Sequence, residues 1–330
     1  MIMGKSKLVE FNYVGELAGL IIDFVLSKRA LGFACSTEAR SLRRFAEFSL
    51  DYDLSECKLP KKLVLDWSER KLNETAETNA KRVSVLRRFA LYLKERGYNV
   101  YVPTNHVITD YSSFTPYIFS NGELSSIFHT SDQLKIRNNS FSNIKATLPV
   151  ILRMLYGCGL RISEAVNLRN EDVNLNEGIL RINNSKFDKS RLVPMADSLT
   201  IICRSLHNRL HLYSKATQYF FTNKDGSHVS ADLVYRRFRD VLWESGIPHG
   251  GRRKGPRLHD LRHTFAVHSL KMQADKGIDL YCTLPILSTY LGHSSIGATE
   301  KYVRLTKEMF PELVEKVSNA CSHVIPEVKV

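Results

Sequence analysis

Hydrophobic positions in the first hundred residues recur every three or four places, which is the period of an amphipathic helix. In one such segment Leu42, Phe45 and Ala46 fall on one side, while arginines fall on the other. Gly97 follows the last of these stripes and is a typical helix-ending residue. The pattern predicts a small helical N-terminal domain with helices at residues 8–30, 36–50, 60–72 and 81–96.

The helical pattern breaks between residues 98 and 116. This stretch contains Pro103, Pro116, several β-branched residues and a pair of serines, and proline cannot continue a helix. We therefore divide the chain into a helical domain at 1–102, a linker at 103–116 and a second domain at 117–330.

The second domain is predicted to be mostly helical with one small antiparallel sheet. Residues 179–183 and 191–194 have β character, and the polar segment between them is typical of a hairpin turn. Ser120 is a typical cap for a helix that begins at Asn121. The remaining apolar stripes predict helices at 141–157, 198–212, 231–244, 258–273 and 283–291. The predicted fold class is therefore mainly α.

Lysine and arginine number 47 against 34 acidic residues, which gives a formal net charge of +13. The excess is spread over both domains, so both could contact the same polyanion. Charge alone fits a solvated basic surface about equally well, and the motifs below favour nucleic acid. The basic residues of the N-terminal helices that we expect to contact DNA are Arg43, Arg44, Lys81, Arg82, Arg87 and Arg88.

Six cysteines are scattered without a CxxC pair, and the N-terminal residues carry no signal-peptide pattern. The longest apolar stretches are interrupted by charges such as Asp23 and are too short to cross a bilayer. We expect a cytoplasmic protein with reduced thiols and no membrane association.

A glycine-rich bend at 157–159 precedes Arg161 and a short amphipathic segment. This order places Arg161 at the start of a helix. On this segment alone, an ordinary surface arginine is the more common interpretation.

His259, Arg262 and His263 are spaced three and four residues apart, so they share one face of a helix. Two histidines four residues apart are also typical of a zinc site. A permanent cation on the same face would repel a divalent metal, whereas a guanidinium binds phosphate through paired hydrogen bonds. We favour a phosphate site, and we expect no metal or other cofactor.

Tyr302 follows His293 by nine residues. A lone tyrosine is normally a packing residue, and its unperturbed pKa of about 10 makes it a weak nucleophile at neutral pH. His259 could accept its proton, directly or through water. Arg161, Arg262 and a histidine could then stabilise the charge that builds on a pentavalent phosphorus.

Lys186 lies on the predicted hairpin turn, where a flexible ammonium could protonate a leaving oxygen. A lysine on a turn is more often simply solvated. The neighbouring Lys189 is an alternative for the same role, and the sequence leaves that choice open.

Taken together, these motifs resemble the tyrosine recombinases, also called the phage integrase family, which includes the Xer and Cre-like enzymes. Gly-Leu-Arg161-Ile-Ser-Glu resembles the first arginine box of the family, and Leu-His259-Asp-Leu-Arg262 resembles its His-x-x-Arg box. Leu-Gly-His293-Ser-Ser followed by Tyr302 resembles its final histidine and nucleophile. The joint pattern spans residues 157–304, and its order and spacing make it specific.

The hairpin motif departs from the family pattern. Ser-Lys186-Phe-Asp-Lys-Ser-Arg-Leu-Val-Pro resembles the lysine box, but the usual form is Gly-Lys-Gly. The N-terminal helices resemble the SAM-like core-binding domain of the family by their pattern rather than by a motif.

The resemblance implies that two basic domains clamp DNA from opposite sides and that Tyr302 attacks a phosphodiester to give a 3′-phosphotyrosine. One phosphodiester is exchanged for another of similar energy, so neither ATP nor Mg²⁺ is needed. Two arginines and the final histidine would hold the phosphate, and the hairpin lysine would protonate the departing 5′ oxygen. The residues assigned to catalysis in this way are Arg161, Lys186, His259, Arg262, His293 and Tyr302, supported by Glu164 and His263.

An apolar stripe continues after Tyr302, at Met309, Phe310, Leu313, Val314 and Val317. By base rate such a stripe packs on its own domain. In the family the corresponding tail packs on a neighbouring subunit, so the resemblance implies a homotetramer held together by the C-terminal helix. The expected partner is double-stranded DNA with inverted-repeat core sites, and the expected location is the nucleoid in the cytoplasm.

Three alternatives remain open at this point. A type IB topoisomerase uses the same chemistry, a DNA-binding regulator could keep the fold without catalysis, and a metal-dependent nuclease could be built on His259 and His263. The biological role is also open among transposition, phage integration, chromosome dimer resolution and inversion. We favour an integrase or transposase of a mobile element.

Overall fold

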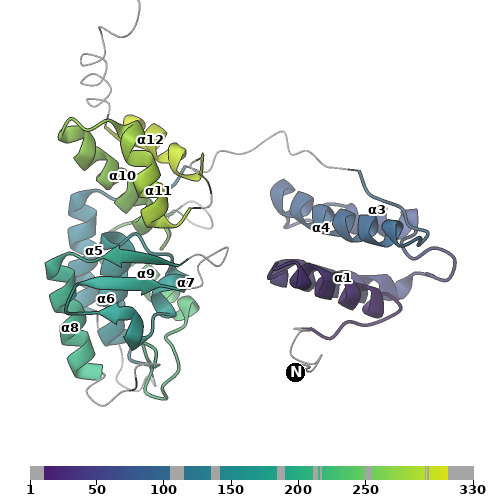
Figure 1. Cartoon of the computed structure of the whole chain (residues 1–330), viewed down its shortest axis with the longest axis horizontal. Coiled ribbons are helices and arrows are strands. Elements are labelled where there is room, and N and C mark those ends of the chain that lie inside the picture. Colours follow the sequence, from purple (N-terminus) through teal and green to yellow (C-terminus); the bar gives the residue numbers. More distant parts are fainter. Residues whose placement is uncertain are drawn as a thin grey trace, which may run out of the picture. The chain divides into compact units, whose positions relative to one another are not determined.

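In the computed structural model, the described residues are 11–104, 115–134, 142–183, 190–210, 215, 218–248, 250, 255–293, 295 and 297–310. The chain divides into two compact units, Met1–Phe114 and Thr115–Val330 (Figure 1). Each unit has a hydrophobic core of its own, and each is described here by itself.

The first unit is a set of helices around an aromatic core. Phe24 packs edge-on against Phe89, with 5.5 Å between ring centroids, and Phe45 packs edge-on against Trp67 at 5.3 Å. These rings come from different helices, so they join the four helices into one core. The elements are α1 (Ala18–Ala30), α2 (Ser36–Phe48), the 3-10 turn η2 (Ser49–Asp51), α3 (Lys61–Ser68) and α4 (Ala76–Glu95).

The first residues of α1 and α4 differ from those that the apolar pattern predicts, and the local backbone explains both differences. α1 starts at Ala18 and not at residue 8, and Gly15 just before it has a φ of +72° that a regular helix does not contain. α4 starts at Ala76, five residues earlier than predicted, because the Thr75 hydroxyl caps it by accepting a hydrogen bond from the backbone N of Thr78 at 3.2 Å.

The second unit packs helices around a three-stranded antiparallel sheet of order β1-β2-β3. Leu180 pairs with Val193 across β2 and β3, and both side chains are buried in the core. The predicted fold class, mainly α with a small antiparallel sheet, is confirmed. The elements are α5 (Asn121–Gln133), α6 (Ile144–Gly157), α7 (Ile162–Val166), η3 (Asn170–Asp172), β1 (Val173–Asn174), β2 (Ile179–Ile182), β3 (Arg191–Pro194), α8 (Asp197–Leu210) and α9 (Ala231–Glu244).

Three C-terminal helices, α10 (Asp260–Asp275), α11 (Leu280–Leu291) and α12 (Gly297–Met309), pack against one another at one end of the second unit (Figure 1). Their shared core includes Val267 of α10 and Tyr302 of α12. The sequence pattern did not predict α12, because two of its inward positions are polar. Thr299 and Thr306 are both fully buried there.

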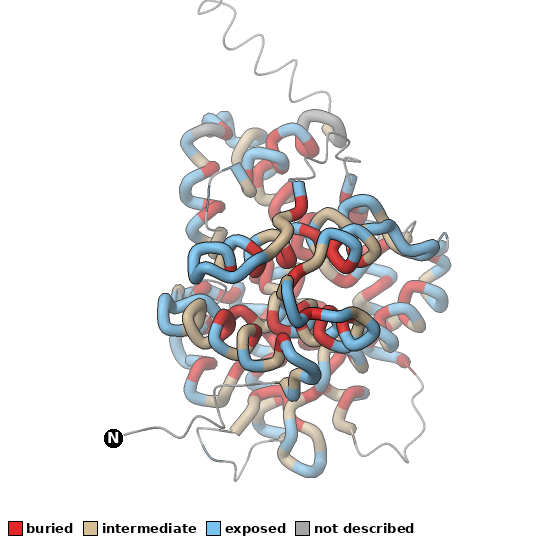
Figure 2. The backbone as a smooth tube through the Cα atoms, turned by 90° about the vertical axis from the view of Figure 1, so that its right-hand side faces the viewer, coloured by how far each residue is buried: buried red, intermediate tan, exposed pale blue. Residues whose placement is uncertain are grey.

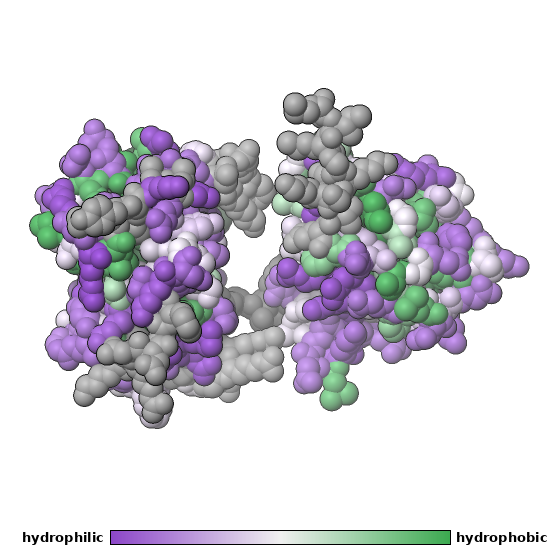
Figure 3. All heavy atoms as spheres, turned by 90° about the horizontal axis from the view of Figure 1, so that it is seen from below, coloured by the Kyte–Doolittle hydropathy of each residue, from purple (hydrophilic) through white to green (hydrophobic). Residues whose placement is uncertain are grey.

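Buried positions follow the inner sides of the helices in both units, and exposed positions follow the outer sides (Figure 2). On the face drawn in Figure 3 the surface is mostly hydrophilic, with separate hydrophobic patches. Within the part of the chain that the structure describes, no helix combines the length and the apolar character needed to cross a membrane.

Candidate active site

Arg262 is a buried guanidinium at the centre of a polar cluster in the second unit. Its side chain is 1% exposed. It donates hydrogen bonds to the carbonyl oxygens of Gly159 at 2.6 Å and Leu291 at 2.7 Å, and to Nε2 of His293 at 3.0 Å. Because an unpaired buried charge is costly, these acceptors hold the guanidinium in place. Burial, together with the charge of Arg161, lowers the pKa of Arg262 to about 10, so it remains charged at neutral pH.

Gly159 allows the chain to pass close to α10 and α11. Its φ of +58° lies in the left-handed region that favours glycine. A Cβ atom at this position would lie 2.5 Å from Cδ1 of Phe265 and 2.9 Å from Cδ2 of Leu291. Glycine is therefore needed at 159 to bring its carbonyl within reach of Arg262.

Arg161 stands at the N-cap position of α7 and is paired with Glu164. Its Nη1 donates to Oε1 of Glu164 at 2.8 Å, and its backbone N donates to Oε2 at 2.9 Å. Its Nη2 donates to the carbonyl oxygen of Gly292 at 3.0 Å. These contacts tie the start of α7 to the chain that follows α11.

Glu164 also accepts two hydrogen bonds from Arg191, at 3.0 and 2.9 Å. Burial acts to raise the pKa of Glu164, but the hydrogen bonds from Arg191 and from the backbone of Arg161 outweigh it and hold that pKa at about 2. Glu164 is therefore an ionised carboxylate shared by two arginines.

His293 is oriented by a hydrogen bond at each ring nitrogen. Nε2 accepts from Arg262, so Nδ1 carries the proton and donates to Oγ1 of Thr299 at 2.7 Å. Gly292, with a φ of +64°, ends α11 and turns the chain into this position. Burial, followed by the charges of Arg262 and Arg161, lowers the pKa of His293 to about 4, so the ring is neutral at pH 7.

Tyr302 is 1% exposed, and its phenol oxygen lies 2.8 Å from Nδ1 of His263. Its ring stacks on that of His293, with 6.1 Å between centroids and an angle of 19° between planes. Burial raises the pKa of Tyr302, and the charges of Arg262 and Arg161 act against this rise. The phenol is therefore protonated at neutral pH and lies beside an imidazole that can take its proton.

His259 precedes α10 and lies beside His263, with ring centroids 4.7 Å apart and perpendicular planes. Burial, with the charge of Arg262 next, lowers the pKa of His259 to about 4. Burial and the neighbouring His259 lower the pKa of His263 to about 3. Both rings are thus neutral and able to accept a proton. The sequence interpretation gave this role to His259, but the direct contact with Tyr302 is made by His263.

The structure gathers most of the residues singled out from the sequence in one cluster. Lys186 and Lys189 lie outside the described residues, in the segment between β2 and β3. Two residues of the cluster were missed by the sequence reasoning, Arg191 and Thr299. The residues that the cluster brings together are Arg161, Glu164, Arg191, His259, Arg262, His263, His293, Thr299 and Tyr302.

In the first unit, the side chain of Arg82 is bound inside the protein, so we no longer count it among the residues expected to contact DNA. Its side chain is only 12% exposed. It donates to Glu74 at 2.7 and 2.9 Å, to the carbonyl oxygen of Glu69 at 3.0 Å and to that of Trp67. Its guanidinium therefore joins α4 to the end of α3.

The side chains of the other five basic candidates of the first unit differ in their exposure to solvent. Arg44, Lys81 and Arg88 are exposed, although Lys81 pairs with Glu77 and Arg88 with Glu38. Arg43 and Arg87 are half-buried; Arg43 pairs with Glu47, and Arg87 donates to the carbonyl oxygen of Pro103. Their contact with DNA stays a prediction.

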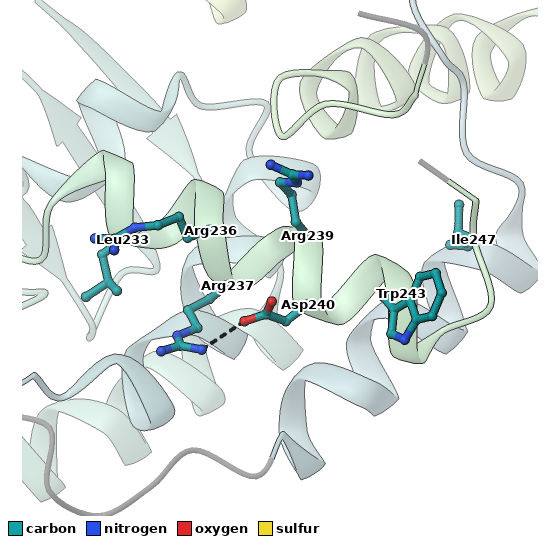
Figure 4. A pocket seen from close by; sticks show the side chains of 7 residues that line it. All are labelled: Leu233, Arg236, Arg237, Arg239, Asp240, Trp243 and Ile247. Atoms are coloured by element: carbon teal, nitrogen blue, oxygen red, sulfur yellow. Dashed lines mark hydrogen bonds and ion pairs between the residues drawn. The ribbon is translucent and has the colours of Figure 1, made fainter. Parts of the chain in front are cut away.

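A basic face on α9 was also missed by the sequence reasoning. A pocket of about 460 Å³ lies along it, and Trp243 at its edge is 82% exposed (Figure 4). Tyr235 of the same helix lies close enough to Asp260 for that carboxylate to raise its pKa, after burial. The pocket is lined by Leu233, Arg236, Arg237, Arg239, Asp240, Trp243 and Ile247.

Comparison with known proteins gives a consistent assignment. The phage integrase family matches residues 119–309. The chain is 28% identical over 299 residues to the putative integrase/recombinase y4rB of Sinorhizobium fredii, a match that covers 89% of this chain and 95% of that protein. It is 26% identical to the tyrosine recombinase XerD of Staphylococcus aureus, over 83% of this chain and 88% of that protein.

Solved structures share the fold. The XerH site-specific recombinase bound to palindromic difH substrate superposes with a TM-score of 0.63 at 19% identity, over 95% of this chain and 92% of that one. The Tn1549 transposon integrase in complex with transposon right-end DNA gives a TM-score of 0.60 at 14% identity, over 86% of this chain and 94% of that one.

Proposed function

This chain belongs to the phage integrase family, and from that premise we propose how its own residues carry out the reaction. It is a tyrosine-type site-specific recombinase that cleaves DNA and rejoins it. The observation that carries the proposed mechanism is the position of the Tyr302 phenol, which lies between His263 and the ring of His293, beside buried Arg262.

The cleavage step exchanges one phosphate ester for another. The oxygen of Tyr302 forms a bond to the scissile phosphorus, the bond from phosphorus to the 5′ oxygen breaks, and a 3′-phosphotyrosine remains. Arg161 and Arg262 hold the non-bridging oxygens, and their preorganised positive charge stabilises the pentavalent state. His293 joins them as a neutral donor once the phosphate replaces it as the acceptor of Arg262, because Nε2 can then carry the proton while Nδ1 accepts from the hydroxyl of Thr299. Lys186, or Lys189 in its place, protonates the departing 5′ oxygen. Attack by a different 5′ hydroxyl in the reverse direction completes recombination, without metal or ATP.

The proton of Tyr302 needs a neutral acceptor. The 2.8 Å contact supports His263 as the first acceptor, because a base must lie within hydrogen-bond reach of the proton that it removes. His259, whose ring adjoins that of His263, becomes an acceptor when the arriving phosphate draws Tyr302 toward itself. The negative charge of the phosphate raises the pKa of both rings, which makes them better bases in the bound state.

Covalent capture tests the proposed function on any DNA, because the protein itself selects the site to which it becomes attached. The full chain is incubated with genomic DNA fragments in EDTA and denatured in detergent, and the DNA that stays attached is sequenced. We expect adducts at a defined site and none with Tyr302→Phe. Adducts that require a divalent metal would support the nuclease alternative, and a Tyr302→Phe protein with full activity in cells would support the regulator.

Duplex DNA is proposed to contact both units. The exposed arginines and lysines of α2 and α4 would bind it from the first unit, and the basic face of α9 from the second. Tyr235 of α9 is close enough to Asp260, the first residue of α10, to feel its charge, which supports a duplex that contacts α9 when its phosphate reaches Tyr302. The base sequence that is recognised depends on side chains in the grooves.

Assembly as a tetramer on inverted-repeat core sites is proposed to use the segment after α12. Leu313, Val314 and Val317 lie outside the described residues. A deletion that began at residue 306 would damage the site itself, because Thr306 is fully buried and its hydroxyl donates to the carbonyl oxygen of Tyr302 at 2.7 Å. A chain that ends at Phe310 should cleave single sites and fail to join two, and unchanged recombination by that chain would refute the proposal.

Exchange between partners distinguishes this function from that of a type IB topoisomerase. With two sites on one substrate, a recombinase gives products with new flanks, whereas a topoisomerase only relaxes supercoils. By its similarity to an integrase/recombinase and its shared fold with a transposon integrase, we propose a role in a mobile element, at the nucleoid in the cytoplasm.

A further inference from the structure

Arg191 stands at the first position of β3, where it pairs with Ile182 at the mouth of the hairpin. Its side chain is only 9% exposed. Nη1 and Nη2 donate to the two carboxylate oxygens of Glu164, and Nε donates to the carbonyl oxygen of Tyr290 at 2.8 Å. Each of its three guanidinium nitrogens thus has an acceptor inside the protein.

Glu164 is the point at which the arginines of the site meet. It receives Nη1 of Arg161 at 2.8 Å and Nη2 of Arg191 at 2.9 Å, and Nη1 of Arg262 lies 3.9 Å away. The carboxylate is 5% exposed, so water screens its charge poorly. Three guanidinium groups therefore surround one carboxylate, and two positive charges remain in excess.

Because Arg161 and Arg191 share Glu164, the contacts of Arg191 determine how closely Arg161 pairs with that carboxylate. A carboxylate takes up a guanidinium most strongly when both of its oxygens are bound side by side. Arg191 occupies that paired geometry, so Arg161 has a single side-chain contact with Oε1 and sends Nη2 to the carbonyl oxygen of Gly292. Without Arg191, the buried carboxylate would draw Arg161 into the paired geometry and cancel its charge.

We propose that Arg191 is a positioning residue for strand cleavage: it takes up most of the charge of Glu164, so that Arg161 keeps a single side-chain contact with that carboxylate and its positive charge remains available to the scissile phosphate. The contact of Arg191 with Gly292 supports the same geometry. A Cβ atom at Gly292 would lie 2.8 Å from Nη1 of Arg191, so the guanidinium packs on the residue that precedes His293. This role rests on the proposed function, because it concerns the same phosphate.

The test compares two substrates that differ in the charge of the scissile group. A suicide duplex is built on a site recovered by covalent capture, once with an ordinary phosphodiester and once with a neutral methylphosphonate. Single-turnover adduct formation is measured with wild type and with Arg191→Met at saturating protein. A neutral group builds less negative charge in the transition state, so the missing positive charge matters less there.

We expect Arg191→Met to slow adduct formation about 100-fold on the phosphodiester. On the methylphosphonate we expect the same variant to slow it by no more than about tenfold. A residue that only supports the fold would cost the same factor on both substrates, and equal losses would overturn the proposal. If the wild-type chain forms no adduct with Tyr302 on any DNA, it is the proposed function that has failed.

A double variant keeps the test decisive even if Arg191→Met does not fold. Glu164→Gln with Arg191→Met removes the carboxylate and its partner together, so neither of these two charges is left buried without the other, and the charges of Arg161 and Arg262 again give an excess of two. We expect this protein to cleave the phosphodiester within about tenfold of the wild-type rate. A loss as large as about 100-fold in a double variant that binds DNA normally would contradict the proposal.

Discussion

The phenol oxygen of Tyr302 and Nδ1 of His263 lie 2.8 Å apart in a part of the second unit where both side chains are buried. Burial raises the pKa of the phenol and lowers that of the imidazole. Both groups are therefore neutral, and the nucleophile is stored in a protonated form. Cleavage then needs an event that makes proton transfer favourable, and the arrival of an anionic phosphate beside the imidazoles supplies it.

Replacement of His263 by Asn should slow adduct formation about 100-fold, because the amide keeps a hydrogen-bond acceptor near the phenol but cannot take its proton. His259→Asn is the matched control variant, and we expect it to slow adduct formation less than His263→Asn does. The rates are measured in single-turnover assays on the suicide duplex. Introduction of a fluorinated, more acidic tyrosine at 302 should recover part of the rate of His263→Asn. A wild-type rate for His263→Asn would show that the contact stores the phenol without acting on its proton.

The histidine cluster should make the protein less stable in acid. His263, His259 and His293 have pKa values lowered to about 3, 4 and 4, below the value of about 6.5 for an unfolded chain. The unfolded chain therefore binds more protons below pH 6.5, so stability is fully present above that pH and is lost as the pH falls toward 4. Asp260, whose pKa burial raises to about 6, acts in the opposite sense over the same range.

Denaturant unfolding near pH 7.5 and near pH 5 measures this effect. We expect each imidazole to contribute on the order of 1 kcal/mol to the loss at the lower pH. His293→Asn should flatten the pH dependence, and His129→Asn, at an exposed position of α5, should leave it unchanged. A free energy of unfolding that is the same at both pH values would contradict the expectation.

The fold class could be predicted from the sequence because apolar periodicity is a local signal. α9 was predicted with the ends that the structure has, Ala231–Glu244, and the β2–β3 hairpin was predicted from its β-branched residues. α12 could not be predicted in the same way, because Thr299 and Thr306 fill inward positions where the pattern requires apolar residues.

The candidate site was recognised from sequence motifs. A motif gives the types of residues at a site, but it does not show which side chains form hydrogen bonds or ion pairs with one another. Arg191 looks like an ordinary strand residue in the sequence, and only the fold brings it to Glu164, 27 residues away. The same limit affected Arg82, which resembles its basic neighbours in the sequence but bonds to Glu74 in the structure. Long-range partners of charged groups are set by tertiary packing, which a one-dimensional pattern does not contain.

Gly159→Ala should destabilise the second unit and misplace Arg262. The left-handed backbone and the 2.5 Å approach to Phe265 together should cost about 3 kcal/mol in the free energy of unfolding. Gly246→Ala is the control, since its φ is also positive but no atom lies within 4 Å of the added Cβ. That change should cost about 1 kcal/mol and leave cleavage unaffected. Equal effects of the two substitutions on cleavage would exclude a role for the close approach at Gly159.

Arg239→Ala should weaken DNA binding through charge alone, because the residue is exposed on α9. We expect the slope of log affinity against log salt to fall by about one, as for the loss of a single phosphate contact, with unchanged thermal unfolding. Lys276→Ala removes an equivalent exposed charge from the far end of α10 and should leave the slope as it is. If both variants behave alike, α9 is not part of the DNA interface.

The covalent link itself is the most direct point of test. The wild-type chain is trapped on the suicide duplex in EDTA and digested with nuclease and protease, and the modified peptide is sequenced by mass spectrometry. We expect a nucleotide remnant joined through its 3′ phosphate to the oxygen of Tyr302 and no adduct from Tyr302→Phe. A remnant on any other side chain, or an adduct that survives the substitution, would contradict the mechanism.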